Sequence, residues 1–221
     1  MANTTVKTIV RQVQRRLIDE DAIRWSDDDM LDYVNSAIKA ILAVRPDAYV
    51  LNHEFVCVEG TEQKLTERTN FLINVVRNDK GKAIRGPHDM LMLDNYYPEW
   101  RNSTPGDEAD CYLYEERDPK VFYLYPAVKD QHKIQIIEAA IPEDITQSEY
   151  TNDVPLLLGP LYDNALIEYM VYLAFSQDNE FAANSNKANL ALAAFNTILG
   201  NKNQSDAVKA TSNQRAQNKP R

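Results

Sequence analysis

Four stretches at the two ends of the chain carry apolar residues at helical spacing. In residues 4–18 the apolar positions recur every three or four residues, with charged and polar residues between them, which predicts an amphipathic helix. Residues 26–45, 155–180 and 184–199 repeat this spacing. Ser26 is followed three positions later by Asp29, so the second helix is expected to begin with a capping box.

The pattern changes toward a period of two between about residues 50 and 140, which predicts a β-rich insertion. Its clearest part is residues 110–140, where three β-prone runs are separated by short polar turns: Tyr112–Tyr114, Val121–Tyr125 and Ile134–Ile137. Strands joined by such short connections are expected to be antiparallel neighbours. Residues 78–81 are expected to form a hairpin turn between two earlier strands.

Together these patterns predict an α+β fold that is mainly α. We expect one domain over residues 1–200, a bundle of about four helices with a central antiparallel β insertion. Residues 201–221 are polar and contain almost no large apolar side chain. This extended C-terminal tail is therefore expected to be disordered when free.

The charge of the chain also differs between residues 1–200 and the tail. The 221 residues carry a net charge of −9, which makes the protein as a whole a poor candidate for binding nucleic acid through phosphate neutralisation. The tail is basic, with Asp206 as its one acidic residue. Its basic residues are Lys202, Lys209, Arg215, Lys219 and Arg221.

The residues that usually carry catalysis or bind metals do not form a recognisable site. The three histidines do not stand at ligand spacing, and the six glycines form no phosphate-binding loop. The two cysteines are interpreted as small apolar strand residues. We therefore expect no catalytic, cofactor-binding or metal site. The absence of an apolar run of ~18 residues indicates a soluble protein made in a reducing cytoplasm, with no membrane partner.

Two acidic clusters have an alternative reading as cation sites. Residues 27–29 are three consecutive aspartates at the start of a predicted helix, where negative charge is favourable. Glu115, Glu116 and Asp118 lie in one predicted turn. Both clusters are interpreted as ordinary structural features, a helix start and a solvated hairpin tip, in preference to metal or catalytic sites.

Aromatic side chains are concentrated in the β-rich region. Along residues 121–125 large side chains occupy both faces of the predicted strand. One reading is a small sheet covered by its own loops; the other is a face that meets a second protein chain, since Tyr and Trp are enriched at interfaces. On the second reading, the candidate residues for subunit or tail contacts are Trp100, Tyr112, Tyr114, Tyr123 and Tyr125.

Four stretches, taken in order, resemble bacteriophage head-to-tail adaptor proteins, also called connector or head-completion proteins. They include Asp21–Leu31 with Val44–Ala48, Val75–Asn78 with Ala83–Arg85 and Met90–Asp94, Asp118–Pro126, and the C-terminal helical pair around Asp163–Tyr169. The similarity covers most of residues 5–200 and stops at the tail. No single motif in it is decisive, but the order and spacing together are specific.

The resemblance implies a structural protein of the virion, placed at the head–tail junction, and no enzyme. Such proteins form a ring, expected here to be a dodecamer because portals are usually twelvefold. The ring binds the portal protein on one side and a tail or nozzle protein on the other, and DNA passes through its lumen without specific binding. The basic tail is the expected portal-docking segment. An alternative is a nucleic-acid-associated accessory protein of phage assembly that uses Arg11, Arg15 and Arg16 together with the basic tail.

Overall fold

The computed structural model describes residues 4–177 and 182–217, with side chains described as far as residue 201. Contacts within the chain divide it into two compact units. The helical unit comprises residues 1–48 and 143–221, and the β unit comprises residues 49–142. The β unit is therefore an insertion between α2 (Asp27–Val44) and the helices that follow it.

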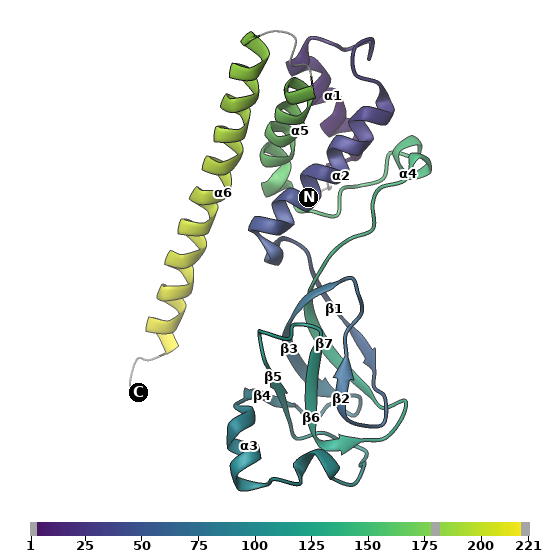
Figure 1. Ribbon diagram of the computed structural model, residues 1–221, viewed down its shortest axis with the longest axis vertical. Coiled ribbons are helices and arrows are strands. Elements are labelled where there is room, and N and C mark those ends of the chain that lie inside the picture. The colour runs from purple at the N-terminus through teal and green to yellow at the C-terminus, as the bar shows by residue number, and fades with distance from the viewer. Residues whose placement is uncertain (1–3, 178–181, 218–221) are drawn as a thin grey trace. The chain divides into compact units, whose positions relative to one another are not determined.

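Helix α5 lies at the centre of the helical unit. It contacts α6 on one side and α1 and α2 on the other (Figure 1). Because α5 has neighbours on several sides, its buried residues are spread around the helix and do not form a single stripe. Besides α2, the helices of the unit are α1 (Val6–Leu17), α4 (Gln147–Thr151), α5 itself (Asp163–Gln177) and α6 (Ala182–Gln217).

Local sequence explains where these helices begin. The Ser26 side chain accepts a hydrogen bond from the Asp29 N–H, and the Asp29 carboxylate accepts one from the Ser26 N–H, so the predicted capping box at α2 is confirmed. Thr146 and Glu149 form the same motif at α4. Thr5 caps α1 with its hydroxyl. The three aspartates 27–29 form the first turn of α2, as the helix-start interpretation expected.

The last helix is longer than the sequence suggested. Its buried residues in the described part are Ala188, Ala191, Phe195 and Leu199, one stripe against α5, with Asn184 near its start. The helix does not end at residue 199 as the spacing predicted, because the backbone continues as a helix to Gln217. The side chains beyond residue 201 lie outside the described ones, and the disorder expected for the free tail stays a prediction.

The β unit contains two sheets, one of three strands in the order β1-β7-β3 and one of four in the order β2-β6-β5-β4. All pairs are antiparallel except β4 with β5, which is parallel. A short helix, α3 (Met90–Tyr96), follows β4. The strands are β1 (Val50–Val56), β2 (Gly60–Lys64), β3 (Thr69–Asn78), β4 (Arg85–His88), β5 (Cys111–Tyr114), β6 (Val121–Val128) and β7 (Lys133–Ala140).

Both sheets contribute side chains to one apolar core. Phe122 and Leu124 of β6 are fully buried there with Ile134 and Ile136 of β7. The ring of Phe55 from β1 meets that of Phe122 at 5.5 Å in an edge-to-face arrangement. The two-sheet arrangement therefore places β6 and β7 on opposite sides of the core.

The predicted fold class is wrong in its architecture. The described residues contain six α-helices and seven strands in two sheets, a mixed α+β fold in place of a four-helix bundle with one antiparallel insertion. The error begins in residues 110–140, where β5 and β6 pair but β6 and β7 do not. Ile134 and Ile136 of β7 enter the core from the three-stranded sheet, opposite β6. The burial of these side chains therefore determines which strands pair with β7, although the connection from β6 to β7 is short.

Candidate docking surface

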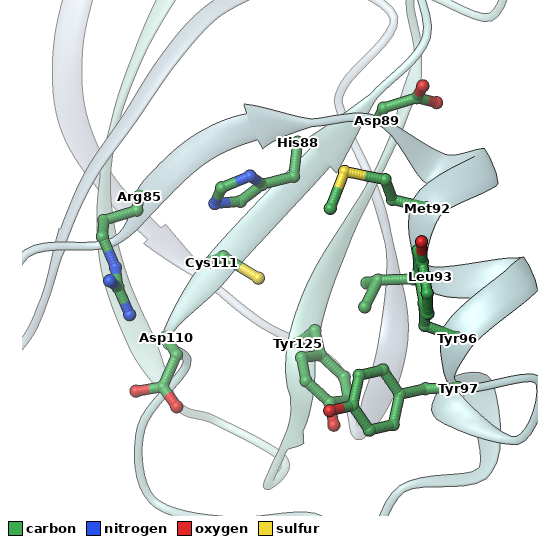
Figure 2. A pocket seen from close by; sticks show the side chains of 10 residues that line it. All are labelled: Arg85, His88, Asp89, Met92, Leu93, Tyr96, Tyr97, Asp110, Cys111 and Tyr125. Carbon is green, nitrogen blue, oxygen red and sulfur yellow. The ribbon is translucent and has the colours of Figure 1, made fainter.

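A pocket of about 590 Å³ lies between α3 and the β4 end of the four-stranded sheet. Figure 2 shows its wall on the helix side, where Leu93, Tyr96 and Tyr97 project, and its wall on the sheet side, where Cys111 and Tyr125 lie. Charged groups stand at its margins. The complete lining is Arg85, His88, Asp89, Met92, Leu93, Tyr96, Tyr97, Asp110, Cys111 and Tyr125.

Helix α3 leaves three of its large side chains exposed. It has no buried residue, and the exposed fractions are 67% at Leu91, 57% at Met92 and 75% at Tyr96, with 61% at Tyr97, the residue that follows the helix. The Asp89 carboxylate caps the helix by accepting a hydrogen bond from the Leu91 N–H at 2.9 Å. Concentrated exposed apolar area of this kind is characteristic of interaction sites.

Trp100 attaches the segment after α3 to the sheet. Its side chain is 2% exposed, and its ring meets those of Tyr123 at 5.7 Å and Tyr125 at 6.4 Å, both edge-to-face. Its indole N–H donates to the Asp94 carboxylate at 2.8 Å. Hydrogen bonds from Arg101 and Trp100 hold the pKa of Asp94 below its usual value, so the carboxylate that receives both groups stays charged.

These contacts show what each face of β6 does. Phe122 and Leu124 point into the core, and Tyr123 and Tyr125 lie on the other face, partly covered by Trp100. A segment of the same chain therefore covers part of the second face, which explains in part why large side chains occupy both faces of β6. Tyr125 also lines the pocket, so part of that face remains open.

The aromatic residues predicted as contacts fall into two groups. Trp100 and Tyr112 are each 2% exposed and belong to the interior of this chain. Tyr114 is half-buried, and its hydroxyl accepts from the Leu72 N–H at 3.2 Å. Tyr123 and Tyr125 are half-buried as well. The predicted partner contacts of these residues stay predictions.

Sequence reasoning missed four exposed side chains: Leu91, Met92 and Tyr96 of α3, and Tyr97, which follows the helix. The run Met90–Leu93 followed by Tyr96 and Tyr97 contains a signal that could have identified them. A helix of seven residues is too short to bury apolar side chains on every side, so some of this run had to face outward. The basic residues of the tail cannot be compared in this way, since Lys202, Lys209, Arg215, Lys219 and Arg221 lie outside the described side chains.

The cysteine near this surface has the properties of a structural thiol. Burial raises the pKa of Cys111, with the Asp110 charge adding to the effect, and burial raises the pKa of Cys57 to about 12. Both thiols are free and stay protonated at neutral pH. In the part of the chain that the structure describes, no three His, Cys, Asp or Glu side chains are grouped to hold a metal ion.

The acidic turn also takes its expected form. The Asp118 N–H donates to the Glu115 carbonyl oxygen at 3.0 Å, which closes a turn between β5 and β6. Glu115, Glu116 and Asp118 are exposed there.

The arginines of α1 are partly committed to acidic neighbours. Arg16 forms an ion pair with Glu168 on α5, and Arg15 lies 3.8 Å from Glu20. Arg11 lines a polar hollow that also contains Glu20, Asp21 and Asp27. Carboxylates thus accompany all three arginines, which weakens the attraction of this face for phosphate.

Among the described residues, no helix combines the length and the apolar character needed to cross a membrane.

A protein-family model described as SU10 adaptor protein matches residues 4–218. No curated protein matches the chain. The family match includes nearly the whole sequence and both structural units, and it confirms the resemblance to phage head-to-tail adaptors at the level of the family. Membership implies a structural component of the virion and a role without catalysis. The chain belongs to the SU10 adaptor protein family.

Proposed function

We propose that this protein joins the portal to the tail of a phage particle as a ring of twelve copies, through which the DNA passes. The observation that carries the proposal is the family match over residues 4–218. Twelve copies follow from the usual symmetry of portals, to which the ring would bind. The acidic composition of the chain, −9 overall, supports a lumen along which DNA slides, because like charge opposes adhesion.

The tail is the proposed contact with the portal. Residues 201–221 carry five basic residues and one acidic residue, and their helical backbone to Gln217 continues from a helix whose earlier part packs on α5. Repetition of the same weak contact in every copy of the ring would give strong attachment through avidity.

The test is the mass of the particle formed with purified portal. The full chain should add a mass equal to twelve copies. A chain ending at Gly200 should add none, while its far-ultraviolet circular dichroism keeps the signal of the remaining helices. A second variant keeps the full length and exchanges all five basic residues of the tail for Gln. It should also fail to attach if the positive charge of the tail makes the contact. Normal docking of the truncated chain would contradict the tail assignment.

The α3 surface is the proposed contact with the tail-side protein. It supports the proposal because four large side chains are more than half exposed there, beside a pocket of about 590 Å³. Aromatic residues and methionine are enriched at the centres of protein interfaces. A polar replacement at exposed positions should cost little folding stability, so a loss of binding would report on the contact itself.

The double variant Leu91→Ser/Tyr97→Ser should still attach to the portal and fail to receive the tail-side protein in a reconstituted particle. The matched control is Leu161→Ser in the helical unit, where Leu161 is 75% exposed, and it should join normally. Unimpaired tail joining by the double variant would rule out α3 as the contact.

A further inference from the structure

Strand β1 presents a backbone edge that no described strand covers. It is the outer strand of the three-stranded sheet, paired only with β7. The pairing runs through seven consecutive residues without a register shift. Five of these residues are exposed, with Val50 at 43% and Val56 at 44%.

The other sheet edges carry features that discourage pairing. Strand β3 has three register shifts, β2 has one and is five residues long, and β4 is four residues long and contains Pro87. Bulges, short length and proline are the means by which natural proteins protect edge strands. Among the described edges, β1 alone combines unbroken register with a length above five residues and no proline.

Hydrogen bonds at the ends of β1 show which backbone groups face outward. The Ala140 N–H donates to the Tyr49 carbonyl oxygen at 3.0 Å, and the Cys57 N–H donates to the His132 carbonyl oxygen at 2.8 Å. In an antiparallel pair, alternate residues bond to the same neighbour. The odd positions of β1 therefore bond to β7, and the N–H and C=O groups of residues 50, 52, 54 and 56 point to the open edge.

The sequence of β1 is nearly symmetric about its centre. Reading Val-Leu-Asn-His-Glu-Phe-Val from either end gives an aliphatic residue, a large apolar residue and a polar residue before His53. In an antiparallel pair of two such strands centred on His53, Val50 would stand opposite Val56, Leu51 opposite Phe55, and Asn52 opposite Glu54. The residues at even positions then exchange backbone hydrogen bonds with one another, which is the alignment that the outward groups require.

We propose that β1 is a docking edge for a second copy of this chain, with the two β1 strands pairing antiparallel about a two-fold axis at His53. The result is a continuous six-stranded sheet in the order β3-β7-β1-β1-β7-β3. A two-fold contact uses the same patch on both copies, and the near-symmetric sequence satisfies that condition. This pairing concerns the free protein and does not depend on the ring or on portal binding.

Neighbouring side chains leave the edge accessible. Gln135 donates to the Asn52 side-chain oxygen at 2.8 Å, and Lys133 pairs with Glu54 at 2.8 Å, so both polar side chains are held toward β7. The His53 ring lies 3.0 Å from the outward Glu54 carbonyl oxygen. That oxygen has two lone pairs and can accept a second hydrogen bond from the partner strand.

A single pair of strands buries less area than the ~1,200–2,000 Å² of a stable interface, so the association should be weak and dependent on concentration. Sedimentation velocity over a range of concentrations should show a monomer–dimer equilibrium. The double variant Val50→Lys/Val56→Lys should weaken it by at least about tenfold, because the apolar pair of Val50 with Val56 occurs twice across the two-fold axis and would become a pair of like charges. The matched control, Ile73→Lys on β3, is 41% exposed in the native chain and should leave the equilibrium unchanged.

Crosslinking tests the register. Only residue 53 stands opposite itself, in a non-hydrogen-bonded pair whose ~4.5 Å Cα separation is compatible with a disulfide. His53→Cys should therefore form a covalent dimer on mild oxidation, while Asn52→Cys and the unmodified chain with its native thiols should do so slowly. Three outcomes would overturn the proposal. The first is that the double lysine variant associates as the native chain does, and the second is that Ile73→Lys weakens association equally. The third is that Asn52→Cys crosslinks as fast as His53→Cys.

Discussion

The helix starts of the helical unit and the core of the β unit depend on hydrogen bonds that span very different distances along the chain. The hydrogen bonds that begin helices in the helical unit are local, such as the capping boxes at Ser26 and Thr146, each made between residues three positions apart. In the β unit the Asn78 side chain, 1% exposed, donates to the Ala109 carbonyl oxygen at 2.8 Å and accepts from its N–H at 2.9 Å. Those partners are 31 positions apart.

The contrast extends to the buried acid of the β unit. Glu138 is 5% exposed and accepts from the Thr69 hydroxyl at 2.7 Å. Its second oxygen lies 3.2 Å from the His53 ring. Three strands must therefore be in place before this carboxylate has its partners, whereas a helix cap needs one turn of chain. The β unit should accordingly fold and unfold as a single cooperative element.

The largest effect should come from removing a core side chain in each unit. Phe122 and Leu166 are both 0% exposed, so Phe122→Ala should cost ~3–5 kcal/mol and Leu166→Ala ~2–5 kcal/mol. Hydrogen exchange should then rise mainly in residues 49–142 for the first variant and mainly in the helices for the second. A uniform rise along the whole chain in both variants would show that the units are not separate in stability.

A smaller effect, confined to the β unit, is expected at Gly86. A Cβ atom there would lie 2.5 Å from the Tyr112 ring and 2.6 Å from the Tyr112 carbonyl oxygen. Gly86→Ala should therefore cost ~1–3 kcal/mol through overpacking and disturb the strands beside the α3 pocket. At Gly106 the nearest atom would be 3.8 Å away, so Gly106→Ala is the matched control. Equal urea midpoints for the two variants would contradict this account.

The smallest effect is expected in the loop between α1 and α2. Burial acts to raise the pKa of Asp19, but hydrogen bonds from the backbone N–H groups of residues 23–25 outweigh it and hold the pKa below its usual value. Because the pKa is lower in the folded chain, the stabilisation is complete above the unfolded value near 3.8 and is lost as pH falls through the folded value.

Asp19→Ala should thus destabilise the helical unit by roughly 1 kcal/mol at neutral pH, and the difference from the unmodified chain should shrink in acid. Urea unfolding followed across this pH range measures it. Asp19→Asn, which keeps one acceptor oxygen, should fall between the two chains. A constant difference down to strongly acid pH would show that the charge of Asp19 plays no part.

The same division explains what the sequence could predict. The α2 capping box could be identified because Ser26 and Asp29 are three residues apart. The separation of β6 from β7 could not, because it depends on which side of the core buries Ile134 and Ile136. The parallel pairing of β4 with β5 likewise joins residues about 25 positions apart, such as Arg85 and Cys111.

At the candidate docking surface, the sequence located the aromatic region but not its exposed members. Trp100 and Tyr112 are of residue types that are enriched at interfaces, yet both are buried within this chain. Tyr96 and Tyr97 remain exposed at the end of α3, a short helix that has no buried residue. Composition identified the residue types, and only packing decided which of them face outward.

The hydrogen bond between Tyr49 and Ala140 determines where the ends of the β unit lie. It holds the first and last strands of the β unit together at the points where the chain enters and leaves that unit. An insertion whose ends are adjacent can be exchanged for another, or for a short turn, without stretching its host. The β unit can therefore be replaced as a whole while the helices on either side keep their sequence.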